Sequence, residues 1–387
     1  MANTLTNLIP DVYAALDVVS RELVGFIPSV GRDSTADRVA LNQTLRSPVT
    51  ASNGAGGDIS PAMALPTIAD QTIGNRTLTI SKSRFFPFSW SGEEQMSVNS
   101  GGPGYLTLRQ DQIAQALRAA VNEIETDIAV AAKNGASRAF GATAGTAPVL
   151  ADWSQAKKIL DDNGAPMSDR SSVFNTAAGV ALRNTANLFR VNESGDTTLL
   201  RQGALGDLYG FTLRESAQIQ STTAGSMASA TSTSAAFTVG QTAIPLATAG
   251  TGLVAAGDII TFANDTNKYV VSSVAIAGAN PASGDIITLA APGLRVAQGV
   301  ATRAITTFAT SARNTAFSRN AIVLATRLPA VPEEGDIALF REVVIDDRSG
   351  LAFEIAAYPG FRMVTYHVSV CWGVSVMKPE HLAIIVG

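Results

Sequence analysis

The stretch TLRQDQIAQALRAAVNEIETDIAVAAKNG, which ends at Gly135, constrains the fold more than any other part of the chain. Its apolar residues recur at the spacing that places side chains on one face of a helix. These residues are Ile113, Leu117, Val121, Ile124 and Ile128. The spacing predicts a helix over about residues 106–134, about 40 Å long at 1.5 Å per residue. A rod of this length suits the backbone of a flat or elongated molecule.

The ends and the polar face of this helix are also predicted by the sequence. Thr107 and Gln110 are interpreted as a capping-box pair, and Asn134 with Gly135 indicates where the helix stops. The face opposite the apolar residues carries Arg118, Asn122, Glu125 and Lys133.

The composition limits the kinds of partner that this chain can have. Its 387 residues can bury a large core and suit two or three domains. Hydrophobic residues make up 46% and charged residues 16%, whereas a soluble domain carries about a quarter charged residues. We infer that something other than water covers part of the surface. The net charge of −4 argues against a basic face that grips nucleic acid, so we expect nearby DNA to be tolerated rather than bound.

Cysteine usage and the N-terminus indicate the compartment. The lone Cys371 excludes an intramolecular disulfide framework and fits a reducing compartment. It lies in an apolar strand pattern, so we expect a buried and unreactive thiol. No signal-peptide layout precedes Arg21, and no apolar run reaches the ~18 residues of a membrane span. We therefore expect a soluble, cytoplasmic protein when it is made, with no membrane partner.

An amphipathic helix and a long excursion are predicted before the long helix. Val12, Leu16, Val19 and Leu23 have helical spacing. From about residue 31 to 84, glycine, proline and small polar residues interrupt every pattern except NRTLTISKS, which alternates like a strand. We interpret this excursion as a loop that reaches a neighbouring subunit. A mobile linker is the alternative, because the glycines at 54–57 would form a flexible hinge.

The segments after the long helix predict an α+β fold class. ADWSQAKKILDDNGAP predicts a helix that ends at Asn163 and Gly164, and SSVFNTAAGVALRNTANLF predicts a short buried strand followed by a helix. LYGFTLRESAQI then alternates. The C-terminal segment predicts a long hairpin turning at residues 346–350, a further strand, Lys378-Pro379-Glu380, and a last apolar strand packed into the fold.

A Ser/Thr/Ala-rich stretch interrupts this α+β domain at about Gln220. Beyond it, about five to six short strands with no intervening helix predict a small closed antiparallel barrel or sandwich. GDIIT begins at both Gly257 and Gly284, with glycine supplying a positive φ and aspartate bonding its own turn. The residues that flank the two copies differ. We therefore interpret the repeat as the same turn sequence used at two places, in preference to a duplicated segment. The insertion has about 85 residues, and its host resumes near Asn320.

No pattern in the sequence indicates catalysis, a cofactor or a metal. The two histidines, His367 and His381, are expected to be structural. No Gly-Lys pair, GxSxG or GxGxxG is present. Four acidic pairs beside turn residues are interpreted as solvated corners: Glu93-Glu94, Asp161-Asp162, Glu333-Glu334 and Asp346-Asp347. We therefore predict no catalytic, cofactor-binding or metal-binding residues, and a protein that is not an enzyme.

The order of these segments resembles the major capsid protein of tailed double-stranded DNA bacteriophages. The form it looks like belongs to certain short-tailed phages, whose coat subunit carries an inserted six-stranded barrel. The resemblance covers essentially the whole chain and lies in the order of its segments, none of which is a catalytic signature. The stretches that carry it are DQIAQALRAAVNEIETDIAVAA, SSVFNTAAGVALRN, RQGALGDLYGFTLRESAQI, GDIITFA, FSRNAIVLATRLPAVPEEG and CWGVSVMKPEHLAIIVG.

The resemblance implies a division of the chain into five parts. It implies an N-terminal arm (1–45), an extended loop over a neighbouring subunit (46–84), and a peripheral domain with the spine helix (85–148 and 337–362). It also implies an axial domain around the capsomer centre (149–221, 310–336 and 363–387) and the inserted β-barrel (222–309), which in this family aids folding and can stabilise contacts between capsomers.

The implied function is structural. Copies of the chain would form hexamers and pentamers of an icosahedral shell, a procapsid that expands into the mature head and encloses DNA without sequence-specific binding. The implied partners are a scaffolding protein during assembly, a portal protein at one vertex and, as a further candidate, a decoration protein. The implied locations are the virion and, during assembly, the host cytoplasm. Some members of the family cross-link their extended loops through a bond between a lysine and an asparagine. Lys82 is the only lysine near the loop in this chain, and no such cross-link is expected.

Two other classes stay open at this point. An encapsulin-like bacterial compartment shares the fold, but its members generally lack an inserted barrel. A secreted β-rich adhesin would tolerate low charge and Ser/Thr tracts, but it should have a signal peptide and should not need the long helix.

Overall fold

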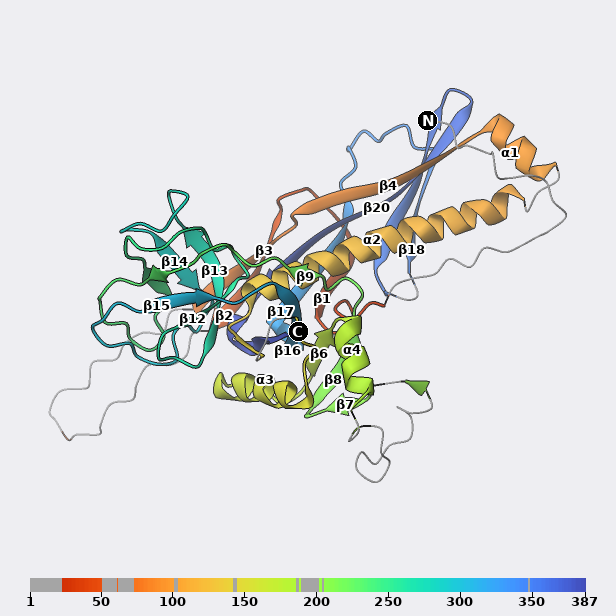
Figure 1. The fold of residues 1–387 in the computed structure, drawn as a ribbon. Coiled ribbons are helices and arrows are strands. Elements are labelled where there is room, and N and C mark those ends of the chain that lie inside the picture. The colour runs from red at the N-terminus through yellow and green to blue at the C-terminus, as the bar shows by residue number, and fades with distance from the viewer. Residues whose placement is uncertain are drawn as a thin grey trace.

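The structure is a computed structural model that describes residues 23–50, 61, 73–100, 104–141, 145–185, 188, 202, 203, 205–346 and 349–387. The helix predicted from Val12, Leu16 and Val19, and the glycines at 54–57, lie outside these residues. The described chain is mixed α+β, as predicted, and most of its regular elements are strands (Figure 1).

A six-stranded sheet and helix α2 form the elongated part of the molecule (Figure 1). The strand order is β1-β17-β20-β19-β18, and β4 also pairs with β20. Only β1 and β17 are parallel. The bounds are β1 (Gly31–Val39), β4 (Lys82–Ser91), β17 (Ile322–Pro329), β18 (Phe340–Ile345), β19 (Ala352–Gly360) and β20 (Met363–Val376). The predicted hairpin at residues 346–350 therefore lies between β18 and β19, and the predicted strand after it is β20.

Helix α2 (Tyr105–Gly135) confirms the predicted long helix to within a residue at each end. Its predicted apolar face is buried from Leu117 to Ala132 and packs between the two large sheets. The predicted capping box is wrong: the N-cap is Gly104 at φ 92°, with no side-chain cap. Instead the Tyr105 N–H donates to Asn99 Oδ1 at 3.0 Å, so the helix begins ahead of Thr107.

The second sheet joins the C-terminus of the chain to its middle. At its centre β16 (Ser311–Ser318) pairs with β21 (Leu382–Val386) and β6 (Arg170–Phe174), and all eight residues of β16 are buried. This strand belongs to the host sheet, so the host resumes next to residue 310, where the implied axial domain begins again, and not near Asn320. The other elements here are β5 (Arg138–Phe140), α3 (Leu150–Asp162), α4 (Thr176–Arg183), β7 (Asp207–Leu208), β8 (Phe211–Glu215), β9 (Ser221–Thr222), η1 (Arg319–Ala321) and η2 (Pro379–His381).

Several predicted helices and strands in and around this second sheet are confirmed. Helix α3 stops at Asp162, next to the predicted Asn163 and Gly164. The predicted strand-then-helix is β6 followed by α4, whose N-cap Asn175 accepts the Ala178 N–H at 2.9 Å. The last apolar strand is β21, and all five of its residues are buried.

The chain between β9 and β16 forms short antiparallel strands around a core of their own. Their order is β10-β15-β12-β13-β14-β11, and β13 also pairs with β5 of the host sheet. Two hydrogen bonds join the edge strands, from Thr233 N to Pro245 O and from Ala247 N to Thr231 O. The bounds are β10 (Ala230–Thr231), β11 (Ala243–Pro245), β12 (Ile259–Phe262), β13 (Lys268–Ala275), β14 (Ile286–Leu289) and β15 (Ala304–Thr307). Antiparallel strands are thus present, while a continuously paired barrel stays a prediction.

The repeated GDIIT segments adopt the same turn, as predicted. Gly257 and Gly284 have φ values of 88° and 100°. Asp258 accepts the Ala255 N–H at 2.7 Å, and Asp285 accepts the Ala282 N–H at 2.8 Å. Strands β12 and β14 begin directly after these two turns.

The excursion before residue 84 contains more strand than the sequence predicted. NRTLTISKS lies in β3 (Ile73–Thr79) and β4, but β1 and β2 (Thr44–Thr50) were missed. Both are polar and largely exposed, because β1 obtains its hydrogen bonds from β17 and β2 obtains them from β3. After β4, helix α1 (Gly92–Asn99) begins with a capping box between Ser91 and Glu94.

Candidate functional site

An apolar edge runs along one border of the six-stranded sheet. Strand β18 is last in the strand order, so one side of its backbone has no partner strand within the described residues. Val343 and Ile345 on this strand are 45% and 65% exposed, and Ile337 and Leu339 just before it are 72% and 61% exposed. An exposed apolar edge strand is a template for pairing with another chain. This edge is the first candidate contact surface.

The turn between β19 and β20 carries a second exposed apolar group. The Phe361 side chain is 93% exposed, and the neighbouring Arg362 has a φ of 54°. Single exposed apolar residues are common on soluble proteins. Phe361, however, lies on the same sheet as the β18 edge, and charged residues are scarce in this chain. We therefore include the turn in the candidate surface.

Aromatic residues hold the first half of α2 against this sheet. The hydroxyls of Tyr105 and Tyr366 lie 2.8 Å apart, and Trp90 Nε1 donates to Gln112 Oε1 at 2.6 Å. The Arg109 guanidinium lies 5.5 Å and 5.7 Å from the two tyrosine ring centres, within range of cation–π attraction. Burial, followed by the hydrogen bond to Tyr366, raises the pKa of Tyr105 to about 12, so the hydroxyl stays protonated. The helix and strands β4 and β20 are thus fastened beyond the main core.

Lys82 connects β4 to the middle of α2. Its Nζ lies 3.0 Å from Glu123 Oε1 and 2.9 Å from Asp127, and Asp127 also accepts from Trp372 Nε1 at 2.8 Å. Burial acts to lower the pKa of Lys82, but the hydrogen bonds to Asp127 and Glu123 outweigh it, and the pKa is raised. The ammonium group is therefore charged and bound by carboxylates of its own chain.

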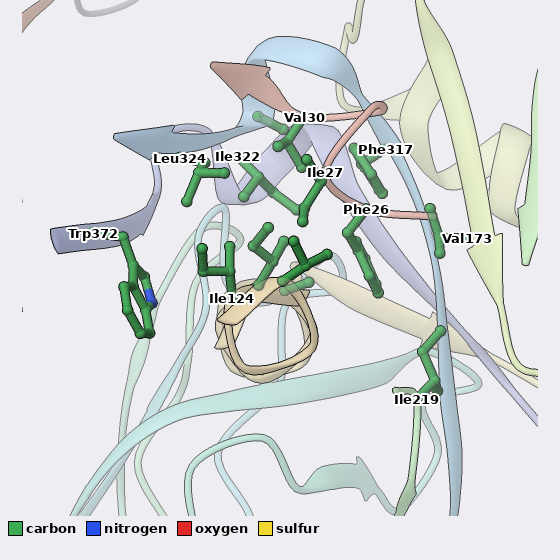
Figure 2. Packing of buried hydrophobic residues seen from close by; sticks show 14 of the residues in the cluster. Phe26, Ile27, Val30, Ile124, Val173, Ile219, Phe317, Ile322, Leu324 and Trp372 are labelled. Atoms are coloured by element: carbon green, nitrogen blue, oxygen red, sulfur yellow. The ribbon is translucent and has the colours of Figure 1, made fainter. Parts of the chain in front are cut away.

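Glu125 fastens the segment before β1 to the same helix. The sequence placed Glu125 on the polar face, which is wrong, because its side chain is fully buried. Oε1 accepts the N–H groups of Gly25 and Phe26, both at 2.7 Å, and Oε2 accepts that of Ile27 at 3.0 Å. Burial raises the pKa of Glu125, and the backbone donors oppose that rise. Figure 2 shows Phe26 and Ile27 between their loop and the helix that carries Ile124.

Two acidic residues interpreted as solvated corners are buried instead. Glu94 is 7% exposed because its carboxylate accepts the Ser91 N–H in the capping box of α1. Asp346 is also 7% exposed, and it accepts the N–H and the hydroxyl of Ser349 in the β18–β19 turn.

The other acidic pairs lie at the surface. Glu333 and Glu334 are exposed, as predicted. Asp161 and Asp162 are exposed as well, but they act as partners of Arg170 and Arg138. Asp347 lies outside the described residues.

The predicted environment of Cys371 is confirmed. It is 1% exposed, and its thiol donates to Ser83 Oγ at 3.2 Å. Burial raises the pKa of Cys371, which keeps the thiol protonated and poorly nucleophilic.

The two histidines pack against neighbouring residues. His367 stacks on Phe85 at 4.8 Å, and burial lowers the pKa of His367. His381 lies in η2, where burial lowers its pKa as well. Within the described residues, His, Cys, Asp and Glu form no group that could hold a metal ion. No helix of the described chain has the length and apolar character needed to cross a membrane.

Solved structures share this fold at low sequence identity. The chain matches a structure from Mycobacterium phage Che8 with a TM-score of 0.50 and 12% identity, covering 99% of this chain and 98% of that one. It matches the capsid structure of cyanophage P-SCSP1u with a TM-score of 0.53 and 12% identity, covering 100% and 95%. It also matches the capsid of a native GTA particle with a TM-score of 0.50 and 11% identity, covering 99% and 98%. The chain therefore has the fold of these structures over nearly its whole length.

Sequence comparison adds no relative. No family model matches the chain, and no curated protein matches it.

Proposed function

We propose that this protein is a major capsid protein of a tailed double-stranded DNA bacteriophage, whose copies assemble into an icosahedral shell. The observation that carries the proposal is the full-length likeness to the cyanophage and GTA capsids, in which hardly any of either chain is left unmatched. The exposed apolar edge of β18 supports it, because repeated contacts between copies would cover such an edge.

The proposal includes finer features. Hexamers and pentamers of the chain form a procapsid with a scaffolding protein and a portal protein. The shell then expands around the genome in the virion, and a decoration protein is a further candidate partner. Expansion proceeds by rigid-body rotation of the domains together with movement of the spine helix and the arm. The two hydrogen bonds that join the chain at the ends of β10 and β11 support a closed inserted barrel of the short-tailed-phage type.

Two negative expectations belong to the same proposal. The shell protein is not an enzyme. It does not cross-link through Lys82, because the charged amine bound to Glu123 and Asp127 is a poor nucleophile. A ladder of covalent oligomers after boiling shells in detergent would contradict the second expectation.

The proposal is tested by expressing the chain alone and together with the gene upstream of it. We expect closed, uniform particles with the neighbour and irregular ones without it, seen by negative-stain microscopy. Uniform shells from the chain alone would favour the encapsulin-like alternative, which no observation on this structure otherwise favours. A monodisperse monomer in both samples would contradict a shell protein.

A further inference from the structure

One buried arginine lacks the carboxylate partner that the other buried arginines have. Arg138, Arg170 and Arg327 are 3% to 6% exposed, and they lie 3.7, 2.6 and 2.8 Å from Asp162, Asp161 and Asp33. Arg313 is 3% exposed, yet no carboxylate of the described chain lies within ion-pair distance of it. An unpaired buried charge is strongly destabilising. The Phe308 ring lies 6.0 Å from the guanidinium, at the limit of cation–π attraction, so a further group that carries negative charge is expected to compensate Arg313.

The hydrogen bonds of Arg313 are also incomplete. Its Nη1 donates to Ser311 Oγ at 2.8 Å, but Nε and Nη2 have no partner among the described residues. The carboxylate that attracts Arg313 most is Asp258, which is 1% exposed and already accepts the N–H groups of Gly225 and Ala255. The Asp258 carboxylate is thus hydrogen-bonded to backbone groups of its own turn and of Gly225. The Nε and Nη2 atoms of Arg313 are left without an acceptor in the described part of the chain.

Arg313 lines a cavity of about 100 Å³ at the root of the insertion. Lys133 of α2 lines it too, with Nζ 3.4 Å from Thr222 Oγ1. Burial and the nearby Arg313 lower the pKa of Lys133. The remaining lining residues are apolar or carry neutral polar groups, so no carboxylate borders the cavity: Thr126, Ala129, Val130, Gln218, Ile219, Gln220, Ser221 and Thr222.

We propose that this cavity binds an oxyanion of the phosphate class. The Arg313 guanidinium, the Lys133 ammonium and several hydroxyl and amide groups around the cavity form the donor set that such an ion requires. The location gives the ion a role. Strand β9, where the chain leaves the host sheet, pairs with β16, where the chain returns. Lys133 in the last turn of α2 bonds Thr222 of β9 and lines the same cavity as Arg313 of β16. The bound ion connects helix α2 to the two strands, β9 and β16, between which the insertion lies.

The test measures thermal unfolding of the full chain, in phosphate and in chloride at matched ionic strength. We expect phosphate to raise the midpoint relative to chloride and to raise it further with each tenfold increase in concentration. Lys133→Met should lose this increment. Lys157→Met, which removes a lysine of α3 outside the cavity, should keep it. Equal increments in Lys133→Met and Lys157→Met would overturn the proposal.

A second measurement keeps the proposal testable if the variants fail to fold. Calorimetric titration of the unmodified chain with inorganic phosphate should show saturable binding, and its absence would overturn the proposal. A short single-stranded DNA oligonucleotide then identifies the source of the phosphate group. If the oligonucleotide stabilises the unmodified chain but not Lys133→Met, the site accepts backbone phosphates. If inorganic phosphate stabilises the unmodified chain and the oligonucleotide does not, the site takes the free ion.

Discussion

Glu125 gives the clearest case of one side chain that holds two distant segments together. It accepts three backbone N–H groups from Gly25 to Ile27 while fully buried. Glu125→Ala leaves these donors unsatisfied, and we expect it to lower the free energy of unfolding by about 3 kcal/mol or more. Urea unfolding of the unassembled subunit measures this loss.

Glu123→Ala is the matched control on the same helix. Glu123 pairs with Lys82 and Arg84 at the surface, and Lys82 keeps Asp127 as a partner. The expected loss is within about 1 kcal/mol. Similar losses for the two variants would contradict the role assigned to Glu125.

The sequence could reveal some of these side-chain roles and not others. Ser91 and Glu94 have capping-box spacing, so the burial of Glu94 could have been predicted from the local motif. Glu125 follows the helical period like any polar residue, and its partners lie about a hundred positions earlier. Arg313 likewise lies in a strand, with nothing local to indicate a cavity.

The two GDIIT turns allow a test of how the insertion docks on the long helix. Both glycines have positive φ, so an added Cβ costs about 1 kcal/mol at either turn. Around Gly284 the added Cβ would meet open space, whereas at Gly257 it would lie 2.3 Å from Asn134 Oδ1 at the end of α2. The Asn134 side chain has to shift, so we expect Gly257→Ala to lose more than Gly284→Ala in urea unfolding, by up to about 1 kcal/mol. Equal losses would show that the Asn134 side chain moves aside at no cost and that the insertion is not closely packed against the end of α2.

Elements with their own periodicity were predicted, and elements defined by their neighbours were not. Helices α2 and α3 and the β18–β19 hairpin carry apolar spacing, caps or turn residues in the local sequence. Strand β1 is polar and exists because β17 offers it hydrogen bonds. Strand β16 is buried on both faces despite its polar sequence SARNTAFS, so it shows no alternation.

The proposed assembly should depend on the β18 edge more than the stability of the isolated chain does. Val343→Lys adds a charge to an exposed apolar edge, so we expect shell yield to fall at least tenfold while subunit unfolding stays within about 0.5 kcal/mol. Val300→Lys, at an 80% exposed position of the insertion, is the control. Sedimentation of co-expressed particles measures the yield. Normal shells from Val343→Lys would exclude this edge as a contact surface.

The three tryptophans are divided among three separate hydrophobic clusters. Trp90 lies with the aromatic residues at the start of α2, Trp153 lies on the buried face of α3, and Trp372 lies in the main core. The core of the insertion has no tryptophan, although Tyr269 is buried there. Each tryptophan is therefore a native fluorophore for one region of the subunit. Fluorescence excited selectively at indole therefore reports on the start of α2, on the cluster around α3 and on the main core. The core of the insertion contributes no indole signal.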